Sequence, residues 1–421
     1  MNGVARRMLV LLIIGVSGAG FIWIGLDVWA GRRVDREFAR LEKRYGSLSG
    51  RSLVASPVAV EFNSARFVRA AVTLTVRPAA NTTYGTLLAS AARFEQQTAP
   101  SAEPEDVRAF VDSNRDAIQL ALEARTRHQA SWDADYASGW KMPSLLDIRT
   151  LGNALVYAAI LDIKRGRHDD ASANAAAGLA VAASLRREPG LLAQLIRVAV
   201  ALQQCEAVRS LVIRSEPSTD ALAALSRALV ESRETDPMRV ALRAELALQN
   251  AAFLKIERGE ATDTFGVRKS PFWFGRIGRP WVRLARLHYL QEMERLIDVE
   301  GGPRPRPPFP DRPRYARWDW RSLGSGFLAG LERAVESGDT HNSVLGVTEI
   351  GVALRRHRLD RGSYPDELSA LVPAYLARLP IDPVTGRPPA YARSGAGFTL
   401  KAQPIRKDSG ANAALEWVVA R

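Results

Sequence analysis

Two carboxylates stand among three aromatic side chains in one short segment of the sequence. Asp133 and Asp135 are separated by one residue and lie near Trp132, Tyr136 and Trp140. Paired carboxylates can supply the acid and the base that cleave a glycosidic bond, and aromatic faces stack on sugar rings. The segment predicts either a catalytic pair, Asp133/Asp135, of an envelope glycan (peptidoglycan) hydrolase, or a binding surface formed by the three rings. We favour a structural interpretation, in which the rings fill the end of a helical bundle and the aspartates cap turns.

One further catalytic pattern overlaps this segment. Ser138-Gly139-Trp140-Lys141 matches S-x-x-K, in which a lysine activates a serine, but the companion Lys-Thr-Gly motif is absent from the sequence. None of the lysines follows a glycine, and the five histidines never form an HExxH spacing, so the phosphate-binding loop and the zinc-protease motif are absent too. Cys205 is the only cysteine, so the sequence predicts no intramolecular disulfide. One cysteine and five scattered histidines also argue against a structural zinc site, and we expect no metal and no cofactor.

A stretch rich in arginine and tryptophan forms the second candidate surface. Residues 268–321 carry thirteen Lys and Arg side chains against six acidic ones. Basic and aromatic side chains together are typical of a surface that meets anionic lipid headgroups. The residues that we assign to this surface are Trp273, Arg276, Arg279, Trp281, Arg283 and Arg286. The alternative is an arginine-coated helix packed against its neighbours. We expect no nucleic-acid partner, because the amino-terminal segment predicts a membrane protein.

That segment is an uncharged run from Met8 to Leu26, preceded by Arg6 and Arg7. Nineteen helical residues span about 28 Å, which is close to the hydrocarbon thickness of a bilayer. Residues 1–34 therefore predict a transmembrane anchor, and the alternative is a signal peptide cleaved after Ala30. The positive-inside rule gives a slight preference for an inside amino terminus, which would put the bulk of the chain in the periplasm at a bacterial inner membrane.

The rest of the 421-residue chain reads as mainly helical, with a net charge of +13 carried by arginine. Residues 35–300 predict a helical body, in which Asn63 caps one helix and another runs from Pro104 to about His128. Alanine-rich helical hairpins from Leu145 onward are typical of an irregular, TPR-like stack. Residues 301–321 are rich in proline and predict a linker, so that 322–421 form a separate domain.

The last segment carries a recognisable order of motifs. A helix over 343–360 is followed by Gly362-Ser363-Tyr364-Pro365, then by Leu379-Pro380 and Asp382-Pro383, and by two strand-like runs, 398–400 and 415–419. Residues 343–421 thereby resemble the globular end of the major pseudopilin of type II secretion. The resemblance implies a long helix, a turn, a short helix and an antiparallel sheet.

More central segments resemble a group of bacterial membrane-anchored helical envelope proteins that share this terminal module. These segments are Asn63-Ser64-Ala65-Arg66, Asp135-Tyr136 with Gly139, and Leu195-Ile196-Arg197-Val198-Ala199. We therefore expect a mainly α membrane-tethered interaction or scaffold protein of the cell envelope, without catalytic activity. Its expected partners are envelope or secretion-system proteins, with a secretion or pilus-like assembly as one context. The glycan hydrolase is the alternative.

Overall fold

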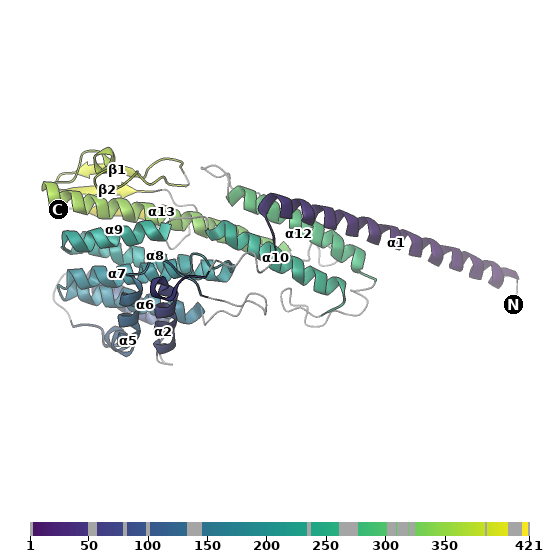
Figure 1. Ribbon diagram of the computed structural model, residues 1–421, viewed down its shortest axis with the longest axis horizontal. Helices are drawn as coiled ribbons and strands as arrows, with labels where there is room; N and C mark the ends of the chain where they lie inside the picture. Colours follow the sequence, from purple (N-terminus) through teal and green to yellow (C-terminus); the bar gives the residue numbers. More distant parts are fainter. Residues whose placement is uncertain are drawn as a thin grey trace. The chain divides into compact units, whose positions relative to one another are not determined.

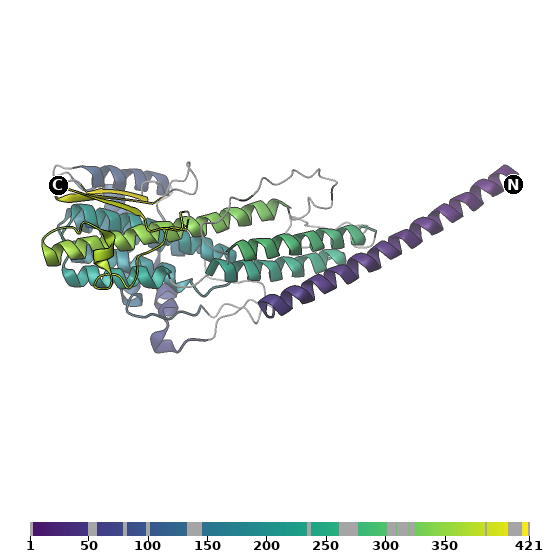
Figure 2. The ribbon, with the colours of Figure 1, turned by 90° about the horizontal axis from the view of Figure 1, so that it is seen from above.

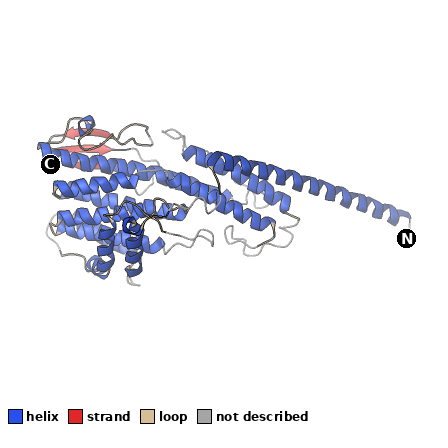
Figure 3. Ribbon diagram, in the orientation of Figure 1, coloured by secondary structure: helices blue, strands red, loops and turns tan. Residues whose placement is uncertain are grey.

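The computed structural model describes residues 3–48, 57–78, 82–97, 102–132, 145–233, 237–260, 277–300, 309, 319, 325–383, 385–402 and 415–419. These residues are mainly helical, with a small three-stranded antiparallel sheet near the carboxyl end (Figures 1 and 3). The prediction of a mainly α chain with a small sheet near its carboxyl end is confirmed.

The chain divides into two compact units. The α1 unit comprises Met1–Leu53, Leu242–Gly301 and Pro308–Arg333, and the sheet unit comprises Val54–Ala241, Gly302–Pro307 and Ala334–Arg421. The division falls inside α10 (Pro237–Glu257) and α13 (Ser325–Arg361). The domain boundaries near residues 300 and 322 stay predictions. The greater part of α10 belongs with the N-terminal helix, because its side chains pack and pair within the α1 unit.

In the α1 unit, α1 (Gly3–Tyr45) packs along α12 (Arg279–Glu300) (Figures 1 and 2). Asp27, Val34 and Leu41 of α1 are buried at intervals of seven residues. A seven-residue repeat keeps one seam of a helix turned toward its neighbour, as in a coiled coil. The rings of Phe253 and Tyr289 join α12 to α10, with centroids 5.7 Å apart.

Two of the described helices are long and apolar enough to cross a membrane. They are α1, whose most apolar 18-residue window has a mean hydropathy of 2.0, and α8 (Leu191–Arg214), whose most apolar window has 1.3. Of the most apolar part of each helix, 61% is buried in α8 but only 6% in α1. Thus α8 is a core helix, whereas α1 exposes large side chains such as Phe21 and Ile22. The predicted apolar N-terminal helix is present, and its features suit a membrane anchor or a signal sequence.

The sheet unit begins with short helices whose bounds reflect asparagine side chains. Asn63 accepts from the N–H of Ala65 at 3.1 Å and caps α2 as predicted. The single helix predicted over 104–128 is wrong, because the structure has two. The break falls at Asn114, whose amide bonds the N–H and carbonyl of Val76 at 2.8 and 3.0 Å. The helices are η1 (Val60–Phe62), α2 (Ser64–Leu74), α3 (Tyr84–Gln96), α4 (Glu105–Ser113) and α5 (Arg115–Ala124).

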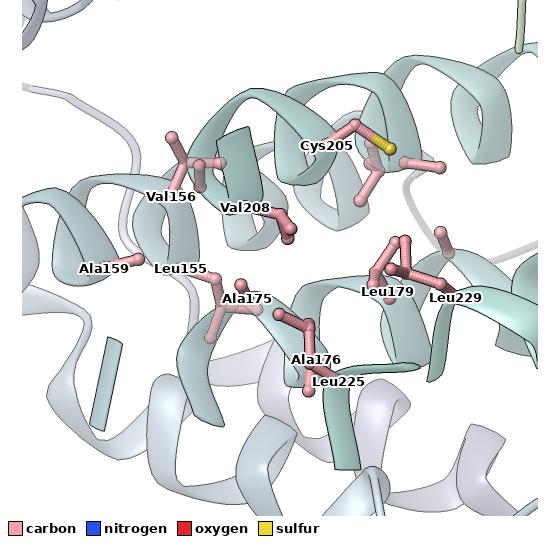
Figure 4. Close-up of a cluster of buried hydrophobic side chains, with 14 of the residues drawn as sticks. Leu155, Val156, Ala159, Ala175, Ala176, Leu179, Cys205, Val208, Leu225 and Leu229 are labelled. Carbon is pink, nitrogen blue, oxygen red and sulfur yellow. The ribbon is translucent and has the colours of Figure 1, made fainter. Parts of the chain in front are cut away.

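The centre of the sheet unit is a stack of α6 (Leu145–Lys164), α7 (His168–Ser184), α8 and α9 (Thr219–Arg233). Alanine, valine and leucine side chains from all four helices fill its core (Figure 4). Small residues allow the close approach that the alanine-rich pattern predicts. A Cβ added at Gly178 would lie 2.2 Å from Gln204, and one added at Gly152 would lie 2.9 Å from Val200.

The carboxyl-terminal part of the sheet unit packs a small sheet on α13. The strands β1 (Ala390–Ser394), β2 (Gly397–Lys401) and β3 (Glu416–Val419) lie in the order β1-β2-β3, and η3 (Leu368–Leu371) precedes them. Trp417 of β3 lies against Gly351 of α13, where a Cβ would come within 2.0 Å of the indole ring. The predicted helix and strands are confirmed, although α13 begins at Ser325 and not at 343.

Candidate functional site

Of the predicted aromatic and acidic site, the structure describes Trp132. Its ring is buried, and its indole N–H donates to the carbonyl of Ser184 at 3.0 Å, at the end of α7. The guanidinium of Arg69 lies 5.7 Å from the ring centroid. Trp132 is therefore a packing residue and offers no free face to a sugar. The other residues of this prediction lie outside the described residues, namely Asp133, Asp135, Tyr136 and Trp140.

The predicted basic surface is described from residue 277 onward, so Trp273 and Arg276 lie outside it. Arg279, Arg283 and Arg286 do share a face of α12. That face is turned toward two buried carboxylates, Asp27 of α1 and Glu257 of α10. These arginines therefore form ion pairs with carboxylates on both neighbouring helices. This agrees with the alternative prediction, an arginine-coated helix packed against its neighbours.

The ion pairs form a continuous chain across the three helices. The Nε of Arg279 donates to Asp27 at 3.0 Å, and an Nη of Arg283 lies 3.0 Å from the same carboxylate. The Nε of Arg283 and an Nη of Arg286 each bond Glu257 at 3.1 Å. The hydrogen bond to Asp27 raises the pKa of Arg279. Carboxylates and guanidinium groups thus compensate each other, which a buried charge requires.

A different set of side chains is exposed near the contact between Asp27 and Arg279. Ile277 is 65% exposed and Trp281 is 45% exposed, at the start of α12. The indole N–H of Trp23 donates to the carbonyl of Ile277 at 2.7 Å, and Arg33 stacks on the exposed ring of Trp29. We call Trp23, Trp29, Arg33, Ile277 and Trp281 the girdle. Amphipathic rings and arginines beside an apolar helix are typical of a membrane–water interface.

The carboxyl-terminal end of α1 is fixed to α12 by further polar contacts. Arg40 and Arg44 both pair with Glu294, and the hydroxyl of Tyr45 donates to Asp298 at 2.7 Å. The hydrogen bond from Arg40 is the main cause that lowers the pKa of Glu294. The α1–α12 pair is therefore held by charged groups at both ends of its contact, with apolar residues between them.

The sheet unit contains a cleft of about 620 Å³ between α3, α6 and α8. Its floor is apolar, and Leu88 of α3, which lines it, is 58% exposed. Arg209 pairs with Glu206 at 2.8 Å, and Arg214 donates to the carbonyl of Glu95 at 2.6 Å. Burial raises the pKa of Glu95. This cleft combines an apolar surface with a few polar groups, which is the usual character of a ligand site.

No protein-family model, curated protein or solved structure matches this chain. The argument for each candidate site therefore comes from the geometry of its residues alone. Within the described residues, no group of three or more His, Cys, Asp or Glu side chains could hold a metal ion.

A second cleft, of about 430 Å³, surrounds Asp162 between α5, α6 and α7. Asp162 accepts from Arg167 at 3.0 Å and from Asn174 at 2.9 Å, and burial raises its pKa. The backbone N–H of Arg167 also bonds the carbonyl of Asp162. These contacts close the turn between α6 and α7, so we interpret Asp162 as a structural residue.

Sequence reasoning missed the carboxylate partners of the basic face. Asp27 is the first charged residue after the apolar run, and that position was a usable signal. Its partners lie about 250 residues away in the sequence; Arg279, for example, follows Asp27 by 252 residues. The cleft residues carried no such signal, because Leu88 and its neighbours read as ordinary positions of amphipathic helices.

Proposed function

We propose that the chain is a membrane-tethered interaction protein of the bacterial cell envelope, without catalytic activity. The observation that carries the proposal is the uncovered apolar part of α1, which ends at a charged contact with α12. Large apolar side chains exposed over this length favour lipid as their surroundings. The amino terminus then lies inside, and the bulk of the chain lies in the periplasm beside the inner membrane.

The girdle would give this protein a second contact with the membrane, beside the anchor. Trp281 of α12 and Ile277, two residues before this helix, are exposed, and α12 packs against the end of the apolar run. Tryptophan rings are favoured at headgroup level, where the apolar face meets lipid and the N–H meets water. The contact would hold α12 against the bilayer surface.

Interaction with envelope or secretion-system proteins is supported by two features of the sheet unit. The tight α6–α7 hairpin and the stack that it joins suit a TPR-like, irregular binding surface. The order α13, η3, β1, β2, β3 suits the pseudopilin-like module that the sequence resembles. This support rests on likeness of architecture, and architecture alone does not specify a partner.

A topology experiment tests the proposal. We would fuse a reporter that is active only outside the cytoplasm after Arg421 and measure its activity and membrane association after alkaline extraction. Reporter activity, membrane retention and an intact mass that includes residues 8–26 are the expected results. A soluble chain that begins near residue 31 would replace the anchor with a signal peptide. A silent, membrane-bound fusion would overturn the periplasmic assignment and with it the envelope partners.

A further inference from the structure

The cleft between α3, α6 and α8 has an apolar floor that runs along α6. Val156 and Ile160 of α6 face it, together with Leu88 of α3 and Ala207 of α8. From Arg149 to Ile160 this face of α6 extends about 16 Å. Leu88 is 58% exposed, whereas Val156 and Ile160 are 8% and 6% exposed, so the apolar lining is a narrow strip between helices. Such a strip favours a long and narrow apolar ligand.

One end of the cleft carries an uncompensated cation. Arg149 forms no ion pair or hydrogen bond with any residue that the structure describes. The side chain of Asn153, one helical turn further along α6, is only 5% exposed, and no hydrogen bond is formed by its amide within the described residues. Residues four apart share a helix face, so the guanidinium and the amide can both reach one group.

The charges along the rest of the cleft are already paired. Arg209 and Arg214 are matched by Glu206 and Glu95. Arg149 is therefore the excess cation among the five charged side chains that line the cleft. A ligand with a single negative charge at one end would complete the balance, and a guanidinium binds a carboxylate with paired hydrogen bonds.

We propose that this cleft binds a fatty acid, with its carboxylate at Arg149 and Asn153 and its acyl chain along Leu88, Val156 and Ile160. The proposal goes beyond anchoring, since the cleft belongs to the sheet unit and does not involve α1. An extended peptide suits the cleft less well. The lining is entirely helical, so it offers no strand edge to the peptide backbone, and unpaired amides over an apolar floor are costly.

A bound helix is also a poor fit. A helix with its side chains is about 10 Å across. An acyl chain is much narrower and can lie along the strip of apolar side chains. The acyl chain also needs no hydrogen bonds along its length, which agrees with the apolar floor.

Photocrosslinking of the full chain in lipid nanodiscs tests the proposal. The probe is palmitate with a photoactivatable diazirine near its methyl end, and adducts are mapped by mass spectrometry after proteolysis. We expect adducts on peptides that contain Leu88, Val156 or Ile160, with competition by unlabelled palmitate. Labelling of residues 8–26 reports contact with the bilayer and tests the anchor separately.

Two substitutions and two matched controls make the test specific. Leu88→Asp places a charge on the floor, and Arg149→Gln removes the cation; each is expected to reduce cleft adducts about tenfold, which corresponds to about 1.4 kcal/mol. Leu146→Asp changes another exposed leucine, 62% exposed and outside the cleft, and Arg66→Gln changes another exposed arginine; both are expected to label as the parent does.

A comparison of head groups separates specific from general apolar binding. Palmitate is expected to compete better than hexadecanol in the parent chain, and this preference is expected to disappear in Arg149→Gln. Far-UV circular dichroism establishes that each variant is folded. Equal labelling of the cleft in the parent and both cleft variants, or labelling confined to residues 8–26, would overturn the proposal.

Discussion

The Nε of Arg279, the first residue of α12, donates a hydrogen bond of 3.0 Å to the carboxylate of Asp27, the first charged residue after the apolar run of α1. Asp27 is 3% exposed, so it is a buried charge at the point where the helix leaves its apolar segment. Arg283 bonds the carbonyl of Asp27 as well, at 2.8 Å. The contact therefore fixes the start of α12 at the end of the apolar run of α1.

The substitution Asp27→Asn is expected to destabilise the α1 unit. It leaves the guanidinium groups of Arg279 and Arg283 without their shared carboxylate, and loss of one partner of a buried ion pair costs about 3–5 kcal/mol. Because Arg279 is partly exposed, we expect the lower end of this range. Thermal unfolding in nanodiscs provides the measurement. Asp35→Asn, at an exposed position of α1, is the control, and equal losses for both variants would contradict the expectation.

A fluorophore at Trp281 is expected to report contact of the girdle with lipid. Trp281→Cys labelled with an environment-sensitive dye should emit at shorter wavelength in nanodiscs and be quenched by a lipid-bound quencher. Native Cys205 does not interfere, because it is buried and burial raises the pKa of its thiol to about 12. Lys43→Cys is the control, since residue 43 lies about 24 Å further along α1 from Asp27. Equal quenching at both positions would contradict a contact confined to the girdle.

The buried histidine of α13, His341, is expected to make the stability of the sheet unit sensitive to acid. His341 is buried, with its Nε2 3.3 Å from an Nη of Arg197, and burial lowers the pKa of the imidazole well below 6.5. Below about pH 6.5, the imidazole of His341 therefore binds a proton in the unfolded chain but not in the folded chain. Stability contributed by neutral His341 is present above about pH 6.5 and is lost as the pH falls below that value.

The measurement is the free energy of unfolding in urea at pH 7.5 and pH 5.5 for the parent and for His341→Gln. The parent should lose more stability on acidification than the variant, whatever their difference at pH 7.5. Glu349 acts in the opposite sense, because burial raises its pKa, but both chains contain it. His357→Gln changes a half-buried histidine in the same helix and serves as the control. Parallel pH profiles for the parent and His341→Gln would contradict the role of His341.

Local signals in the sequence predicted local structure well. The cap at Asn63, the alanine-rich hairpin and the C-terminal strands follow from side-chain chemistry or periodicity within about ten residues. Contacts that join distant segments were not predictable. Asn114 breaks a helix because it bonds to Val76, and Asp27 is buried because α12 supplies arginines, and neither partner can be identified from spacing along one chain. The cleft also depends on how three helices meet, which periodicity does not define.

The contact between Trp417 and Gly351 gives the last prediction, on the carboxyl-terminal module. Gly351→Ala is expected to destabilise the sheet unit by about 1–3 kcal/mol, because the new methyl group would overlap the indole ring and force the sheet away from α13. Gly330→Ala in the same helix is the matched control, since a Cβ there meets nothing within 4 Å. Alanine favours a helix over glycine by about 1 kcal/mol, so this control should be neutral or stabilising. Urea unfolding followed by far-UV circular dichroism measures both variants. If Gly351→Ala were as stable as Gly330→Ala, the sheet would not be packed on α13 through this contact.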